Sequence, residues 1–203
     1  MTQPELSFDI LRTFVETLSA EIGPETFKAV LSKSELPREW ATMSSFQSMD
    51  GGQKAQSYAR LQSALRTYYG RGARGILLRI GSKMWKPLLD SAPLGVKTQA
   101  SLVRGLPKPL RRKQALEVLA KLLSFKRGDV TVHTLDLDLL FVDLASPTST
   151  GQIEESPICF VNLGLIRECL FWALGEEHDI EERACCAAGA RQCEFKITIG
   201  VQK

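Results

Sequence analysis

Apolar residues recur every three or four positions through the first half of the chain, which is the spacing of amphipathic helices. The pattern predicts helices over residues 5–22, 24–31, 55–69 and 76–89. Gly23 ends the first of them and Gly70 ends the third, because glycine disfavours the helix interior. Residues 41–57 are rich in Ser, Gln, Gly and Met and predict a loop.

The pattern changes after a predicted helix over residues 114–125. Alternating Val, Thr, Leu and Phe over residues 130–142 indicate extended structure, with a break near Asp136 or Asp138. A further helix over residues 162–174 closes at Gly175. The chain then ends in a predicted hairpin, with strands near residues 178–187 and 192–199 and a turn at residues 188–191.

Helices that lead and strands that come late predict the α+β class, with N-terminal helices, an antiparallel sheet and a C-terminal hairpin. The length fits one domain over residues 1–203. Within it we expect N-terminal helices over residues 1–40, the loop over 41–57 and a core over 58–199.

Gly70, Gly72 and Gly75 spell G-x-G-x-x-G, the pattern of dinucleotide-binding loops. Such loops follow a strand, and here a helix precedes the glycines. We therefore interpret them as a turn or a close helix contact.

The formal net charge of +3 is too small to indicate a nucleic-acid partner. The N-terminus lacks the basic and apolar runs of a signal peptide, and no stretch is apolar enough for a membrane span, so we expect a cytoplasmic protein. Residues 90–113 are basic and contain prolines. We interpret them as a solvated loop, with a docking patch for an acidic protein partner as the alternative. The Ser- and Thr-rich residues 146–151 predict a flexible loop.

Five cysteines lie in the last quarter of the chain, and an odd number argues against a disulfide framework. In the last strand, Cys193 shares the inward face with alternating apolar residues. A three-residue turn would place Cys185 opposite Cys193, and a two-residue turn would place Cys186 there. Cys159, at the start of the preceding helix, could join them.

A carboxylate could complete four metal ligands. Strict alternation favours Glu181, whereas a bulge beside the Cys185–Cys186 pair would admit Glu182. Zinc accepts thiolate and carboxylate ligands in a tetrahedral shell, and nearby Arg183, Arg191 and Lys196 could offset the excess negative charge. Buried thiols or a redox disulfide are the alternatives. Cys169 lies on the apolar face of its helix and is expected to be a core residue.

The C-terminal segment GLIRECLFWALGEEHDIEERACCAAGARQCEFKI resembles the 4-vinyl reductase domain, and YYGRGARGILLRIGSKMW is similar to its central helical segment. The resemblance implies an α+β fold shared with haem nitric-oxide sensors and with subunits of a Golgi transport complex. It also implies binding of small hydrophobic molecules. Some members are sensor domains of phenol-responsive transcription activators, and others are implicated in bacteriochlorophyll biosynthesis.

Phenol-sensing members of this family hold zinc with one Cys, then E-x-x-C, then a Cys seven residues further on. Glu182, Cys185 and Cys193 match that pattern, and Cys159 stands where the upstream Cys belongs. The resemblance therefore implies a structural metal site built from these four residues. The positions of the family's phenol-binding His and Trp fall near Leu110 and Asp138, so phenol recognition is not implied. Neither His133 nor His178 is placed as the proximal ligand of a haem sensor.

We expect a binding, sensing or carrier module for a small hydrophobic or aromatic ligand. On the helix over residues 76–89, the expected ligand-binding residues are Ile80, Met84, Trp85 and Leu88, for which plain core packing is the alternative. A tetrapyrrole vinyl reductase or its accessory protein, and a thiol or iron–sulfur redox sensor, are the alternative functions. We further expect a homodimer, because the N-terminal helices carry more apolar surface than a small sheet can cover.

Overall fold

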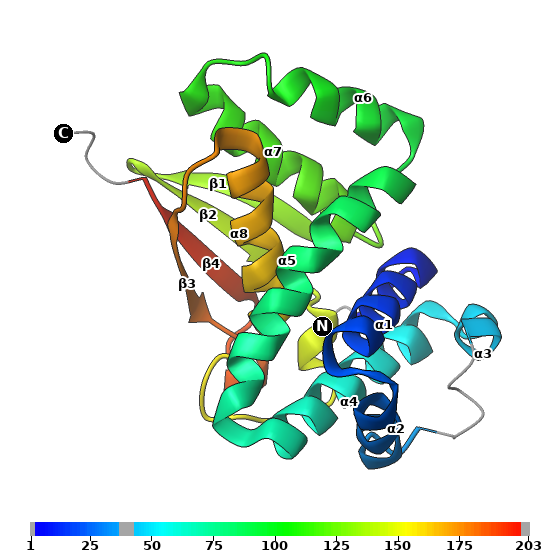
Figure 1. The fold of residues 1–203 in the computed structure, drawn as a ribbon. Coiled ribbons are helices and arrows are strands. Elements are labelled where there is room, and N and C mark those ends of the chain that lie inside the picture. The colour runs from blue at the N-terminus through cyan, green and yellow to red at the C-terminus, as the bar shows by residue number, and fades with distance from the viewer. Residues whose placement is uncertain (1–2, 37–42, 200–203) are drawn as a thin grey trace.

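The computed structural model describes residues 3–36 and 43–199 of the chain. Its N-terminal helices, α1 (Phe8–Ile22), α2 (Pro24–Lys33), α3 (Met43–Gln47) and α4 (Gly51–Tyr69), gather at one end of the molecule (Figure 1). Ser7 caps α1 by accepting a hydrogen bond from the Ile10 amide. Gly23, at a φ of 80°, lets the chain turn directly into α2, whose first residue is Pro24.

The predicted loop over residues 41–57 is wrong for its described part. Residues 43–47 form α3, and α4 begins at Gly51. The start of α4 is a capping box, in which the Asp50 carboxylate accepts from the Gln53 amide at 2.7 Å and the Gln53 side chain accepts from the Asp50 amide at 3.0 Å. Gly51 and Gly52 suggested a break in the sequence, but the cap starts the helix ahead of them. Residues 41–42 lie outside the described ranges.

The longest helices of the second half cross at two glycines. α5 (Ala73–Ser91), which follows a 3-10 turn at Gly70–Gly72, packs against α8 (Phe160–Leu174). A Cβ atom at Gly81 would lie 2.1 Å from the Val161 carbonyl oxygen, and one at Gly164 would lie 2.1 Å from the Leu78 carbonyl oxygen. Only glycine allows the two backbones to approach this closely.

The basic segment over residues 90–113 is not a loop. It contains α6 (Leu94–Val103) and the first turns of α7 (Lys108–Leu123). Pro93 and Pro107 stand immediately before these helices, where a proline starts a helix rather than interrupts one.

Part of the positive charge of this segment is used inside the molecule. Arg111 donates to the Ala173 carbonyl oxygen at the C-terminal end of α8, and Lys108 and Arg112 pair with Glu176 just beyond that end. Cations stabilise the carbonyl end of a helix, so these residues anchor α8.

The sheet contains β1 (Val130–Leu135), β2 (Asp138–Asp143), β3 (Asp179–Ala184) and β4 (Cys193–Thr198) in the order β1-β2-β4-β3, with antiparallel neighbours. The predicted break lies between β1 and β2, where Asp136 takes a φ of 53°. α7 and α8 pack on one face of the sheet, and α5 lies over α8 (Figure 1). The predicted α+β class is confirmed.

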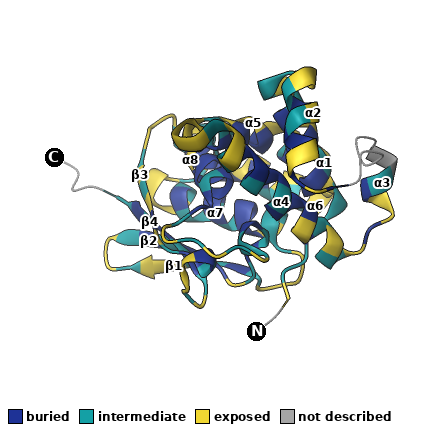
Figure 2. Cartoon of the chain, turned by 90° about the horizontal axis from the view of Figure 1, so that it is seen from below, coloured by how far each residue is buried: buried dark blue, intermediate teal, exposed yellow. Residues whose placement is uncertain are grey.

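The core runs from the N-terminal helices through α5 and α8 to the inner face of the sheet, where Phe141, Phe195 and Ile197 are fully buried. Figure 2 shows buried residues where the helices meet and more exposed ones along the strands. None of the helices in the described ranges combines the length and apolar character that crossing a bilayer requires.

The apolar residues of α1 and α2 lie in this same core, including Leu11, Phe14 and Val30, none of which is exposed. The excess of apolar helix surface from which a homodimer was predicted is therefore covered within one chain. The homodimer itself stays a prediction.

Candidate metal centre

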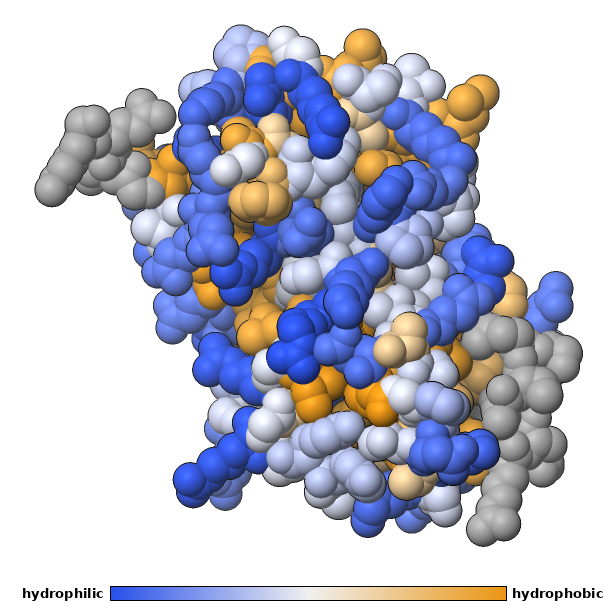
Figure 3. Space-filling view, viewed as in Figure 1, coloured by the Kyte–Doolittle hydropathy of each residue, from blue (hydrophilic) through white to orange (hydrophobic). Residues whose placement is uncertain are grey.

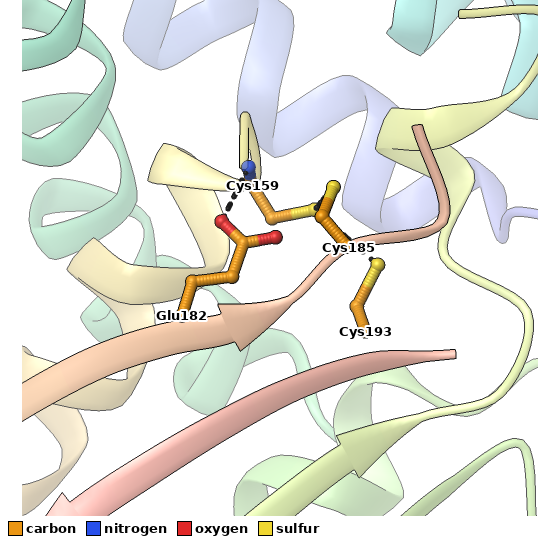
Figure 4. Close-up of side chains that lie close together, drawn as sticks. All are labelled: Cys159, Glu182, Cys185 and Cys193. Atoms are coloured by element: carbon orange, nitrogen blue, oxygen red, sulfur yellow. Dashed lines mark hydrogen bonds between the residues drawn. The ribbon is translucent and has the colours of Figure 1, made fainter. Parts of the chain in front are cut away.

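Four side chains converge where α8 begins and the C-terminal hairpin turns: Cys159, Glu182, Cys185 and Cys193 (Figure 4). Their ligand atoms all lie within 4.8 Å of one another, and all four residues are buried. The Cys159 sulfur lies 3.8 Å from the Cys185 sulfur and 3.6 Å from the Cys193 sulfur. The sequence resemblance named the same four residues.

Separate elements supply these side chains. Cys159 is the residue before α8, so its side chain lies beside the helix N-terminus. Glu182 comes from β3, and Cys193 is the first residue of β4, on the face shared with Phe195 and Ile197. The cluster therefore joins the hairpin to the helix that covers it.

A bulge in β3 decides which glutamate faces inward. Glu182 pairs with Phe195 and Ala184 pairs with Glu194, so one extra residue, Arg183, interrupts the register. Glu182 is 8% exposed, whereas Glu181 is exposed and lies opposite Lys196. Strict alternation, which favoured Glu181, fails because the bulge lets Glu182 and Cys185 reach the same side.

The hairpin turn is longer than either turn considered from the sequence. β3 ends at Ala184, a 3-10 turn covers Cys186–Ala188, and Gly189 takes a φ of 88° before the chain returns. The Cys185 carbonyl oxygen accepts from the amides of Ala188 and Ala190. This turn holds Cys185 near Cys193 without a two- or three-residue connection.

The distances suit one tetrahedral metal ion. With a zinc–sulfur bond of about 2.3 Å, two sulfurs of a tetrahedral shell stand about 3.8 Å apart. In a four-iron cluster each thiolate binds a different iron atom, and the sulfurs must stand further apart than the Cys159, Cys185 and Cys193 sulfurs do. The Glu182 Oε1 atom is buried without a hydrogen-bond partner, which leaves one carboxylate oxygen free for a cation.

The protein itself arranges these groups to exchange protons for a cation. The hydrogen bond with Cys185 raises the pKa of Cys159, and the hydrogen bond from Cys159 lowers the pKa of Cys185. Burial raises the pKa of Glu182 to about 8. Burying several acidic groups together is unfavourable unless protons or a cation neutralise them.

The charges expected to offset the site are used elsewhere. Arg183 pairs with Glu194 at 2.8 Å, and Lys196 pairs with Asp138 at 3.0 Å. Arg191 is exposed. Backbone amides take their place, because the Cys159 amide donates to Glu182 at 2.9 Å and the Cys186 amide donates to the Cys193 sulfur at 3.3 Å. Such donors favour the deprotonated forms that a metal needs.

Sequence reasoning missed a buried polar group beside the cluster. Asp143, at the end of β2, is opposite Cys193 and accepts from the Asn162 side chain at 3.3 Å. Burial raises the pKa of Asp143 to about 6. The Ser146 hydroxyl lies 3.6 Å from the Cys159 sulfur. No spacing rule links β2 to the cluster, because the link arises only when β2 pairs with β4.

The predicted flexible loop over residues 146–151 is instead packed against the core. Its 3-10 turn, Pro147–Ser149, carries the fully buried Thr148, whose hydroxyl accepts from the Gln62 side chain of α4. The segment thus ties the cluster's surroundings to the N-terminal helices.

The two remaining cysteines differ in their surroundings. Cys169 is buried on α8 and donates to the Ala115 carbonyl oxygen at 3.2 Å, in agreement with its expected place in the core. Cys186 is half-buried in the hairpin turn, beside the cluster.

The expected ligand-binding residues Ile80, Met84, Trp85 and Leu88 are all buried on α5. Trp85 packs edge-on against Trp172, with ring centroids 5.3 Å apart. Leu88 lines a cavity of about 190 Å³ between α1, α5 and α7, beside the turn at Ala92 and Pro93. A ligand-binding role for the four residues stays a prediction.

Comparison with known proteins gives the C-terminal part of the chain a family. The model of the 4-vinyl reductase domain matches residues 145–199. These residues are a 4-vinyl reductase domain. The predicted resemblance is confirmed there, and the match contains all four residues of the cluster. No curated protein matches the sequence of the chain.

Solved structures share the fold of the whole chain. An Fe(II) unliganded H-NOX protein from K. algicida has a TM-score of 0.58 and 14% identity over 97% of this chain and 100% of that one. An H-NOX protein from S. oneidensis in the Fe(II)NO ligation state has a TM-score of 0.57 and 12% identity over 95% and 98%. The phenol-responsive sensory domain of the transcription activator PoxR, with phenol, has a TM-score of 0.49 and 15% identity over 70% and 72%. The 4-vinyl reductase domain therefore lies within a chain of H-NOX fold.

The side chains do not suit a haem held by histidine. The sequence contains two histidines. His133 lies exposed on β1, where its Nε2 atom pairs with Thr131. The Nε2 atom of His178 accepts from Arg112, and burial lowers its pKa. Neither ring lies on a helix, so the H-NOX fold is present here without a helical histidine to hold haem.

Proposed function

We propose that the chain is a binding module for a small hydrophobic or aromatic molecule, and that a structural zinc ion at Cys159, Glu182, Cys185 and Cys193 holds its 4-vinyl reductase domain together. One observation carries the metal site: three thiols and a carboxylate, all buried, stand at the spacing of one tetrahedral shell. Four protein ligands leave no open position for a reacting water, so the role is structural.

The metal content of protein purified without chelator tests this site. We expect about one equivalent of zinc per chain and no visible absorption, since zinc is colourless. A brown protein containing iron would favour the iron–sulfur alternative, and sharp visible bands would favour a bound tetrapyrrole. Less than about a tenth of an equivalent of any transition metal would contradict the site.

The H-NOX fold and the family match support ligand binding, and the cavity at Leu88 supports a place for it. An apolar cavity of about 150 Å³ can bind benzene. The cavity here, of about 190 Å³, is lined by Ile10, Leu88, Val96 and Leu122, among others. It therefore has room for a single-ring aromatic molecule, with Ile80, Met84 and Trp85 packed along the same helix.

A variant that fills this cavity is expected to abolish the binding. Toluene should raise the melting temperature of the natural protein, because a ligand that binds only the folded state stabilises it. Leu88→Phe should weaken toluene binding at least about tenfold, and Ile10→Phe, from α1, should act in the same way. Leu94→Phe, on the exposed side of α6, serves as the control. Equal binding by all the variants in isothermal titration would refute the cavity as the ligand site.

The homodimer remains part of the proposal and is tested by mass. Light scattering at micromolar concentration should give twice the chain mass of 22.5 kDa. A monomer mass would remove the dimer and leave the metal and ligand sites untouched, since all their residues come from one chain.

A further inference from the structure

A second hollow lies at the opposite end of α8 from the metal cluster. It is a cleft of about 450 Å³ between α5, α6 and the last turn of α8, lined by Leu89, Asp90, Lys97, Ala100, Ser101, Arg104 and Trp172. This volume falls within the range of about 300–1,000 Å³ that is typical of small-molecule sites.

An aromatic side chain forms one wall of this cleft. Trp172 is held by the edge-on contact with the buried Trp85. The Arg104 guanidinium carbon lies 5.0 Å from the centre of the Trp172 ring, and an Arg104 nitrogen lies 3.5 Å from the Trp172 carbonyl oxygen. A flat cation is thus held over an indole, and most of its N–H donors are left for another acceptor.

The uncompensated charges around the cleft are positive. Asp90, the acidic residue among its lining, is already paired with Lys86 at 2.9 Å. Within the described ranges, no carboxylate forms an ion pair with Lys97 or Arg104. Figure 3 shows hydrophobic side chains near the end of α8, with hydrophilic surface around them. A ligand here would meet an apolar and aromatic wall and two cations that lack an anion.

We propose that this cleft binds a small planar aromatic anion, such as an aromatic carboxylate. Its ring packs against Trp172 and Leu89, and its carboxylate accepts hydrogen bonds from Arg104 and Lys97. The site goes beyond the proposed function, because it shares no residue with the metal cluster or with the cavity at Leu88. A neutral ring of the same shape gains only the apolar contact.

Calorimetric titration with 2-naphthoate and with the neutral 2-naphthalenemethanol tests the proposal on the full chain. We expect naphthoate to bind once per chain, to quench tryptophan fluorescence, and to bind at least about tenfold more tightly than the alcohol. Arg104→Gln and Lys97→Gln should each weaken naphthoate about tenfold and leave the alcohol unchanged. Lys28→Gln, on exposed α2, removes the same charge elsewhere and should change nothing.

Equal affinity for the two probes, or the same naphthoate affinity in Lys97→Gln and Lys28→Gln, would overturn the proposal. If Arg104→Gln loosens the end of α8, the exposed Lys97 carries the comparison alone, since it forms no ion pair with the described residues. Absence of naphthoate binding to a protein that still binds toluene would remove this cleft and leave the proposed function intact.

Discussion

Cys193→Ser is expected to release the metal and to lower the melting temperature by at least about 10 °C. Cys193 is fully buried, and its sulfur lies 3.6 Å from that of Cys159. A hydroxyl is a poor zinc ligand, so the remaining thiols and Glu182 would be left buried together without a cation. Because the site forms only on folding, the binding energy of the metal contributes directly to the free energy of unfolding. Elemental analysis and calorimetry measure the two effects.

Cys169→Ser is the matched control. It replaces an equally buried thiol on α8, and the serine hydroxyl can keep the hydrogen bond to the Ala115 carbonyl oxygen. We expect full metal content and a melting temperature within a few degrees of the natural protein. Equal loss of stability in both variants, with the metal retained in Cys193→Ser, would show that the cluster is only a group of packed thiols.

Gly164→Ala should destabilise the protein by about 3 kcal/mol, although alanine favours helices by about 1 kcal/mol over glycine. A Cβ atom at this position would lie 2.1 Å from the Leu78 carbonyl oxygen and 2.9 Å from the Ser82 amide. Both are backbone atoms and cannot rotate away, so α5 and α8 must separate. For a domain of this size the change corresponds to a fall in melting temperature of about 10 °C.

Gly95→Ala tests whether the contact, rather than the glycine, causes this effect. Gly95 lies in α6, and a Cβ atom there meets no other atom within 4 Å. We expect this variant to be unchanged or slightly more stable. If thermal unfolding shows the same loss for both variants, the close crossing of α5 and α8 does not exist in solution.

Local patterns predicted most of the elements. Gly23 and Gly175 end α1 and α8 as expected, and the alternation of Cys193, Phe195 and Ile197 places them on the inner face of β4. These features depend on neighbouring residues alone, which is why the sequence is sufficient to predict them.

Features that depend on packing escaped prediction. The bulge at Arg183 turns Glu182 inward, and only the resemblance to a known family, not periodicity, selected that glutamate. The basic segment is helical, and its Arg111 finds a carbonyl oxygen at the end of α8. Asp143 reaches the cluster through the pairing of β2 with β4. Each requires knowledge of a partner that is distant in the sequence.

The crossing of α5 and α8 also bears on the order in which the chain can fold during synthesis. Residues 73–91 leave the ribosome well before residues 160–174, so α5 has no α8 to pack against until the intervening residues 92–159 have been made. Cys159 directly precedes α8, and the other three residues of the cluster follow that helix. A nascent chain that stops before residue 160 therefore exposes the apolar face of α5, and the metal can enter only in the last step of assembly.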